Sequence, residues 1–158
     1  MARWGKVDFK QLERLQKKMQ RYEKFDSEEF CRMAAKNLAA RLLVKVIKRT
    51  PVISGDLRRG WTAGEEHVNE KGNVVGIWGK NGFAANMEVE KKGNDYFITV
   101  SNGMEYAPYV EYGHRTYDHK GWVKGRFMLT ISEQELQSTS PKIIEKLLYE
   151  KLKELFDD

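Results

Sequence analysis

The sequence contains a single cysteine, Cys31, among 158 residues. One cysteine excludes an internal disulfide bond and a cysteine-rich zinc site, so we expect the chain to fold in a reducing cytosol. No apolar run approaches the roughly 20 residues that a membrane-spanning helix needs, and we expect no membrane partner. No apolar segment follows the basic start of the chain, residues 1–6, so we expect no secretory signal peptide.

Residues that carry catalytic or metal chemistry are also scarce. The chain has three histidines, and the group His114, Asp118 and His119 matches no zinc-ligand spacing. No serine, threonine or cysteine stands in a recognisable nucleophile pattern, and no glycine-rich phosphate loop is present. We therefore predict no catalytic residues, no metal site and no cofactor. An enzyme of an unrecognised type would need a pocket on which titratable groups converge.

What the sequence does contain is enough apolar material for one core beneath a strongly charged surface. Hydrophobic residues make up 41% of the chain and charged residues 32%, which is typical of one folded domain of this length. The net charge of +5 is carried entirely by residues 1–24, which hold eight basic and three acidic side chains. A basic segment on a neutral body indicates either a contact with nucleic acid or an acidic protein, or simply a solvated helix face.

The helical periodicity is clear in the first third of the chain. Apolar residues recur at helical spacing over 8–24, which predicts a first amphipathic helix. Asp26 with Glu29 is typical of a helix N-cap, and Pro51 predicts where this second helix ends. The alanine-rich apolar face of the second helix is broad, so we expect a sheet plus the first helix, or another subunit, to cover it.

The middle of the chain predicts short strands. The pattern is weak over 61–68 and 73–78, whereas 87–90 and 96–100, separated by the turn residues 92–95, predict a hairpin. Residues 106–112 fit either a helix or an extended segment.

The last third of the chain mixes an aperiodic segment with helices. Residues 113–126 have no period and several glycines, which favours an ordered or mobile loop. An apolar stretch from Phe127 predicts a helix to about Leu136, and Ser140 with Pro141 predicts the start of a last helix. The order of elements predicts an α+β fold, with long N-terminal helices packed on a small, mostly antiparallel sheet and C-terminal helices.

Two segments are unusual for an ordinary domain. Residues 50–61 end a long helix, turn at a glycine and carry the adjacent arginines Arg58 and Arg59. Residues 106–114 place three tyrosines and Glu111 just before the glycine-containing segment. Tyrosine is enriched in protein interfaces, although core packing explains some of these rings equally well.

These two segments resemble the HK97 gp10-like family of phage proteins, which are head–tail joining or tail-completion components. The resemblance covers residues 26–136, between a basic N-terminal helix (1–25) and a C-terminal amphipathic helix (137–158). Ile53 and Gly60 depart from the family pattern, which affects only the local turn. The matching residues are Thr50, Pro51, Val52, Ser54, Gly55, Leu57, Arg58, Arg59, Trp61, Tyr106, Ala107, Tyr109, Val110, Glu111, Tyr112, Gly113 and His114.

The resemblance implies a structural protein of the virion neck that joins the head connector to the tail and has no catalytic activity. It also implies a ring, hexameric in the family, whose partners are the head connector or stopper and the tail terminator or tube proteins. DNA that passes through the lumen is a further contact, and assembly takes place in the host cytoplasm. A closed ring needs two different patches on each subunit, which suits the broad helix face and the tyrosine-rich segment.

We predict that the interface includes both unusual segments and the glycine-containing stretch, which would act as a docking loop. An alternative of another class is a small nucleic-acid-binding module that uses the basic first helix with Arg58 and Arg59; its binding would weaken steeply with salt. The candidate interface residues are Arg58, Arg59, Trp61, Tyr106, Tyr109, Glu111, Tyr112, His114, Arg115, Tyr117 and Trp122.

Overall fold

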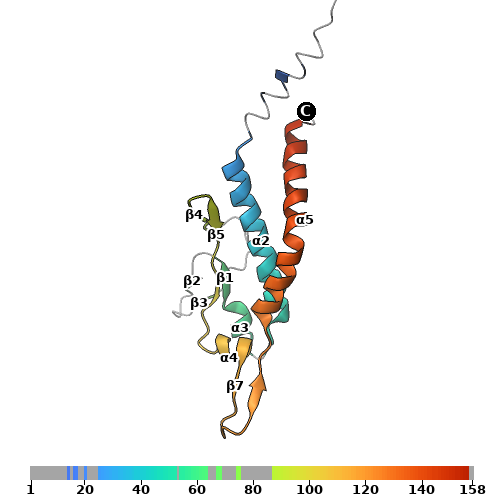
Figure 1. Ribbon diagram of the computed structural model, residues 1–158. Helices are drawn as coiled ribbons and strands as arrows, with labels where there is room; N and C mark the ends of the chain where they lie inside the picture. Colours follow the sequence, from blue (N-terminus) through green and yellow to red (C-terminus); the bar gives the residue numbers. More distant parts are fainter. Residues whose placement is uncertain are drawn as a thin grey trace, which may run out of the picture.

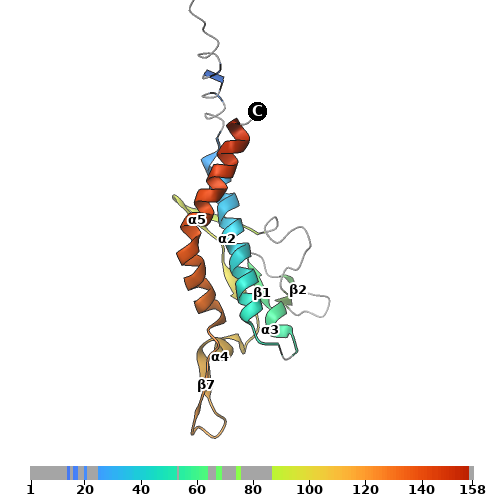
Figure 2. The ribbon, with the colours of Figure 1, turned by 90° about the vertical axis from the view of Figure 1, so that its right-hand side faces the viewer.

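Two long helices lie side by side along the molecule in the computed structural model, with short strands beside them (Figures 1 and 2). The structure describes residues 25–52, 54–63, 67–68, 74–75 and 87–156, together with Arg14, Gln16, Lys17 and Gln20, which are helical. The rest of the helix predicted over 8–24 lies outside the described residues. The helices are α2 (Ser27–Arg49), α3 (Asp56–Arg59), α4 (Ala107–Tyr112) and α5 (Met128–Phe156).

Helix α2 begins and ends where the sequence predicts. The side chain of Asp26 accepts hydrogen bonds from the backbone N–H groups of Glu28 and Glu29, at 2.9 and 3.0 Å, so Asp26 is the N-cap. At the other end Thr50 is extended and Pro51 follows it, which prevents a further helical turn.

The broad apolar face of α2 is covered within the chain. Leu43 and Val46 are almost completely buried between α5 on one side and strand β1 (Trp61–Ala63) on the other. Strand β5 (Asp95–Phe97) packs further along the same helix. Cover by strands was predicted, whereas the large contribution of α5 was not.

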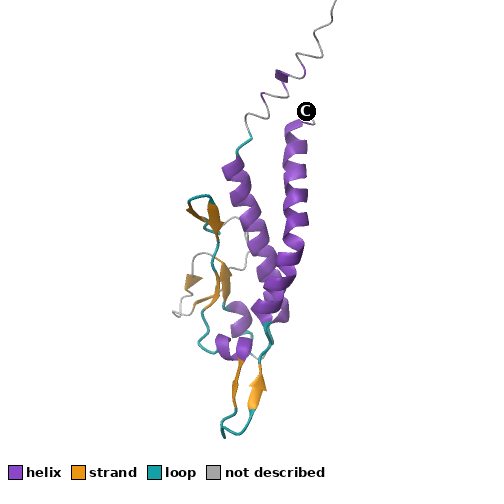
Figure 3. Ribbon diagram, in the orientation of Figure 1, coloured by secondary structure: helices purple, strands orange, loops and turns teal. Residues whose placement is uncertain are grey.

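The described strands form four antiparallel pairs, which confirms the α+β class (Figure 3). Strand β1 pairs with β6 (Val100–Asn102), with Trp61 opposite Asn102. Strand β2 (His67–Val68) pairs with β3 (Val74–Val75), and β4 (Glu90–Lys92) pairs with β5. The predicted hairpin is therefore present, but its turn is only Gly93–Asn94 and Val100 belongs to the other ladder.

The segment 113–126, predicted as a loop, is a second hairpin. Strand β7 (Gly113–Arg115) pairs with β8 (Trp122–Lys124) and places His114 opposite Val123. The strands are only three residues long, too short for an alternating pattern to be visible in the sequence. Segment 106–112, which the sequence left open between two structures, is helical as α4.

The predicted helix break at Ser140 and Pro141 is wrong, because α5 continues through both residues. A proline inside a helix has no N–H for the carbonyl four residues earlier, here that of Gln137. The hydroxyl of Ser140 donates to this carbonyl at 3.1 Å and so replaces the missing donor. No helix among the described residues is both long and apolar enough to span a bilayer.

Candidate assembly interface

Glu111 joins α4 to the start of α5. Its side chain is 6% exposed, and its two carboxylate oxygens accept the backbone N–H groups of Leu129 and Thr130 at 3.0 and 2.9 Å. The hydroxyl of Thr130 donates a third hydrogen bond at 2.8 Å. The first N–H groups of a helix have no partner inside the helix, and they attract a negative charge. Glu111 thus supplies, from another helix, the cap that α5 lacks in its own sequence.

Two glycines bring the base of the hairpin against α4. Gly113 has a φ of +87°, and a Cβ at this position would overlap the carbonyl oxygen of Val123. A Cβ on Gly125 would overlap the carbonyl oxygen of Glu111. Only glycine allows both the positive φ of Gly113 and this close backbone approach, so the hairpin leaves α4 in one fixed direction.

The tip of this hairpin is closed by hydrogen bonds of its own. The backbone N–H of Thr116 donates to Gly121 at 3.0 Å, and the Thr116 hydroxyl accepts the Gly121 N–H at 2.9 Å. The same hydroxyl donates to Asp118, and this bond, with the Lys120 backbone N–H, lowers the pKa of the Asp118 carboxyl. The tip is thus a turn closed by its own hydrogen bonds.

The hairpin exposes apolar side chains on both faces of its two-stranded ribbon. It projects from the end of the molecule beyond α4 (Figures 1 and 2). Val123, 44% exposed, shares one face with His114, while Trp122, 62% exposed, lies on the other face opposite Arg115. Tyr117 at the tip is fully exposed. Exposed apolar groups gathered in this way are typical of a surface that binds another molecule.

A hollow surface connects the hairpin to the first motif. A hollow of about 540 Å³ lies between α4 and β7, where the Tyr109 ring meets the His114 ring edge-on at 6.1 Å. A second, of about 270 Å³, lies between α4 and the turn after α2. The first is lined by Tyr106, Tyr109, Val110, His114 and Arg115, and the second by Pro51, Ser54, Gly55, Leu57, Tyr106 and Val110. Because the two share Tyr106 and Val110, the tertiary structure brings both sequence motifs to one surface.

Pro51, Leu57 and Val110 belong to this surface, although the sequence did not select them as site residues. The i, i+4 spacing of Tyr106 and Val110 would have placed Val110 beside Tyr106, had the segment been taken as a helix. The proximity of Pro51 and Leu57 to α4 depends on tertiary contacts and left no signal in the sequence.

In the first motif, three predicted site residues hold the turn in place. Trp61 is buried, and its indole N–H donates to the Thr50 hydroxyl at 2.9 Å. The Arg58 guanidinium donates to the Thr50 carbonyl at 3.0 Å. Arg59 lies 2.6 Å from Asp56, and the hydroxyl of Ser54 together with Arg59 lowers the pKa of this carboxyl.

Gly60, which departs from the family pattern, lies against the side chain of Asn102. The side-chain amide of Asn102 donates to the Leu57 carbonyl at 2.8 Å and ties the turn to β6. A Cβ at Gly60 would lie 2.6 Å from the amide oxygen of Asn102. A larger residue at position 60 would therefore displace this link.

The candidate residues thus fall into two groups. Trp61 and Glu111 are buried and Arg58 is partly buried, so they shape the surface from below. The exposed group is Arg59, Tyr106, Tyr109, Tyr112, His114, Arg115, Tyr117 and Trp122. Their part in an interface stays a prediction, and only the exposed group is placed to touch a partner.

The described residues hold no group of three histidine, cysteine, aspartate or glutamate side chains arranged as metal ligands. Of the loop residues considered for a metal, Asp118 already accepts hydrogen bonds from Thr116 and Lys120. Cys31 is half-buried on α2.

Such a site, an exposed aromatic ribbon on a small α+β body, is typical of a structural protein that binds other proteins. Comparison with protein families matches residues 13–113 to the family of bacteriophage HK97 gp10, a tail component. This match spans more than half of the chain, and the chain therefore belongs to the HK97 gp10-like family. It is a structural component of the phage tail and so of the virion. Comparison with curated proteins and with solved structures gave no match.

The family match contains both motifs, up to Gly113, and extends the resemblance toward the N-terminus. It begins at residue 13, inside the segment that the sequence analysis placed outside the family domain. It ends where β7 begins, so the rest of the hairpin and α5 lie beyond the matched residues.

Proposed function

We propose that this protein is a neck component that joins the head connector to the tail, and that it works as a ring of six copies. The observation that carries the proposal is the projecting hairpin β7–β8, which exposes apolar residues on both faces and has a rigid base. Covering both faces of such a ribbon is most favourable in free energy, because each aromatic ring left exposed to water costs free energy. We infer that one face meets a neighbouring copy and the other meets the next layer of the neck.

The partners that fit this role are copies of the chain, the head connector or stopper, and the tail terminator or tube proteins. A heterologous contact between different patches closes a ring when its rotation allows. The protein would assemble in the host cytoplasm and remain in the virion neck. We also propose that it catalyses no reaction, in keeping with the structural role of its family.

The test replaces the two most exposed rings of the hairpin in a phage that carries this gene. The double variant Tyr117→Ala/Trp122→Ala should yield filled heads and separate tails in electron micrographs, with the infectious titre reduced at least about 100-fold. Loss of two exposed aromatic anchors costs a few kcal/mol of binding at an interface, where a tenfold change is about 1.4 kcal/mol.

The matched control is Phe97→Ala, because Phe97 is an exposed aromatic residue on the other hairpin, β4–β5. It should leave heads joined to tails. Joined particles at normal titre in the Tyr117→Ala/Trp122→Ala phage would refute the proposed role of the hairpin.

Contact with DNA in the lumen would depend mainly on residues 1–24, which carry the net positive charge. Arg58 and Arg59, which the alternative of a nucleic-acid-binding module also used, already bind Thr50 and Asp56. A chain that lacks residues 1–24 should lose any salt-dependent binding to a DNA duplex, measured by fluorescence anisotropy between 50 and 300 mM salt.

A further inference from the structure

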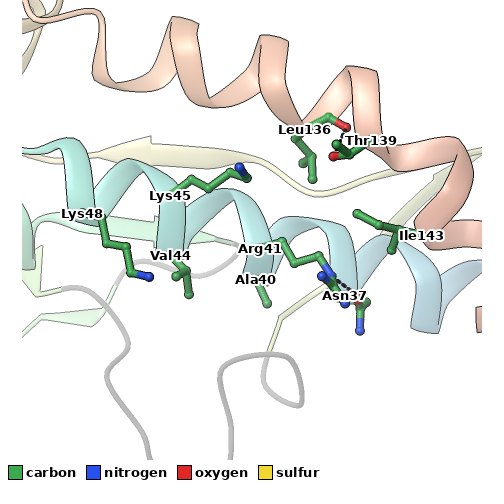
Figure 4. Close-up of a pocket in the computed structure, with 9 residues that line it drawn as sticks. All are labelled: Asn37, Ala40, Arg41, Val44, Lys45, Lys48, Leu136, Thr139 and Ile143. Atoms are coloured by element: carbon green, nitrogen blue, oxygen red, sulfur yellow. Dashed lines mark hydrogen bonds between the residues drawn. The ribbon is translucent and has the colours of Figure 1, made fainter.

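A third hollow lies between α2 and α5, away from the hairpin. It has a volume of about 710 Å³ and runs along α2 from Asn37 to Lys48 (Figure 4). Six of its residues come from α2 and three from α5. They are Asn37, Ala40, Arg41, Val44, Lys45, Lys48, Leu136, Thr139 and Ile143, and they define what we term the α2–α5 groove.

The groove combines apolar side chains with positive charge. Val44 on α2 is 47% exposed, and Leu136 and Ile143 on α5 are half-buried. Three of the nine lining residues are cations, Arg41, Lys45 and Lys48, and none is acidic. An apolar floor with cations along it suits an amphipathic helix that carries acids on one side.

Part of this positive charge is already compensated within the chain. Lys45 lies 2.7 Å from Glu135, which also pairs with Arg49, and Arg41 donates to Asn37. Among the described residues Lys48 has no acidic side chain within ion-pair distance. The groove therefore keeps a net positive charge that a partner can complement.

We propose that the α2–α5 groove receives the acidic end of α5, residues 150–158, from a second copy of this chain. The proposal deepens the ring of the proposed function, on which it rests. The segment reads Glu-Lys-Leu-Lys-Glu-Leu-Phe-Asp-Asp, with four acids, two lysines and three apolar residues. Within α5, Glu150 and Glu154 stand four residues apart, the same spacing as Arg41 and Lys45 in the groove.

Equal spacing allows both acids to face both cations when the two helices lie side by side, because residues four apart share one helix face. The C-terminal end of a helix also carries a partial negative charge, which the groove cations would attract.

The end of α5 cannot enter the groove of its own chain. Helix α5 is continuous from Met128 to Phe156, and Ile143 is its last residue in the groove. At about 1.5 Å per residue, Glu150 lies about 10 Å and Phe156 about 20 Å further along the helix, away from the groove. A neighbouring copy must therefore supply the segment, which makes the contact head-to-tail and suits a closed ring.

The test measures binding of a peptide, so it does not depend on whether the free protein forms rings. A fluorescein-labelled peptide of residues 143–158 is titrated with the full chain at 50 mM salt and followed by anisotropy. We expect saturable binding that weakens at 500 mM salt, because exposed ion pairs are screened. The full-chain variant Arg41→Glu/Lys48→Glu should bind the peptide at least about tenfold more weakly. Lys92→Glu, an exposed charge reversal on β4, is the matched control and should bind like the wild type.

A charge exchange separates specific pairing from a general loss of attraction. A peptide with Glu150→Lys/Glu154→Lys should bind the wild-type groove poorly and the Arg41→Glu/Lys48→Glu groove better than the unchanged peptide does. Circular dichroism and thermal unfolding of each full-chain variant show whether it is folded, and unfolded variants are replaced by the single change Lys48→Glu.

No saturable binding up to about 1 mM peptide, or equal binding by the groove variant, would overturn the proposal. It would also be overturned if the groove variant lost binding to a DNA duplex while peptide binding stayed unchanged. Such a result would not contradict the proposed neck function. That function is tested separately, by whether heads are joined to tails in the Tyr117→Ala/Trp122→Ala phage.

Discussion

The two hairpins of the molecule differ in how the rest of the fold holds them. The β4–β5 hairpin is held along its length by α2, where Lys91 pairs with Glu28 at 2.5 Å and Arg32 donates to the Val89 carbonyl at 3.0 Å. Arg32 also lies over the ring of Tyr96, 5.8 Å from its centroid. The β7–β8 hairpin is held at its base, by Gly113, Gly125 and the backbone beside Glu111.

The two hairpins therefore differ in whether side chains of the same chain satisfy their exposed groups. On β4–β5 the exposed charges meet partners within the chain, so the hairpin is largely satisfied by its own fold. On β7–β8 the rigid base fixes the direction, while Trp122 and Tyr117 point into solvent. An isolated two-stranded ribbon is marginal in water, which supports the proposal that a partner covers β7–β8.

The largest effect on this comparison should come from Glu111→Ala, which removes the side-chain link between α4, at the base of the projecting hairpin, and α5. Three hydrogen bonds to a buried carboxylate are lost, and the N–H groups of Leu129 and Thr130 lose their partner. We expect the free energy of unfolding in urea to fall by about 3 kcal/mol. Glu111→Gln, which keeps an acceptor oxygen, should lose less than half as much. A loss below about 0.5 kcal/mol for Glu111→Ala, the range of ordinary surface changes, would mean that the cap is not important.

A smaller effect on the free energy of unfolding should distinguish the two hairpins when one glycine of each is replaced by alanine. Gly113 and Gly93 both have positive φ, +87° and +64°, but a Cβ on Gly93 meets no atom within 4 Å. Gly93→Ala should therefore cost only the positive φ, about 1 kcal/mol, whereas Gly113→Ala should cost about 2 kcal/mol more, because a Cβ there overlaps Val123 and because φ +87° with ψ 173° is a conformation that essentially only glycine adopts. Urea unfolding of both variants measures the difference. Equal costs would show that the base of β7–β8 yields to a side chain.

The smallest expected effect is a pH dependence of the β4–β5 attachment. Hydrogen bonds from Lys91 and then Arg32 lower the pKa of the Glu28 carboxyl below its ordinary value of 4.5. A lowered carboxyl pKa stabilises the fold above the unfolded value, and this contribution is lost as the pH falls through the folded pKa. The thermal midpoint should therefore drop on acidification below about pH 4.5, and less steeply in Glu28→Gln.

The exposed neighbour Glu88 provides the control, and Glu88→Gln should keep the wild-type dependence on pH. A remaining slope is expected in Glu28→Gln, since Lys45 and Arg49 lower the pKa of Glu135 in the same direction. An identical acid transition in Glu28→Gln and the wild type would show that the Glu28 contacts add nothing to stability.

Local rules in the sequence were sufficient for the elements that a few neighbouring residues determine. The N-cap at Asp26 and the stop at Pro51 fixed the bounds of α2, because capping and proline geometry act within about four residues. The turn at Gly93–Asn94 likewise indicated the β4–β5 hairpin. The same local rule failed at Pro141, where Ser140 supplies the donor that proline lacks and a helix start was predicted instead of a continuous helix.

For the candidate site, too, the sequence predicted some features and not others. The sequence identified the tyrosine-rich segment and the arginine-containing turn as unusual, and both lie on one hollow surface. It gave no reason to separate Glu111 and Trp61, which are buried, from Tyr109 and Trp122, which are exposed. Burial depends on what packs above a residue, and that information lies in distant parts of the chain.

The amino-acid sequence alone therefore determined the α+β class, the bounds of α2, the two family motifs and the likeness to a phage tail component. These features depend on short-range sterics, capping and residue identity, which neighbours in the chain decide. Only the tertiary structure decided that residues 113–124 project as a rigid ribbon, that Glu111 caps α5, and that α2 and α5 enclose a cationic groove. Each of these requires groups that are far apart in the sequence to meet, and no local pattern of residues records such a meeting.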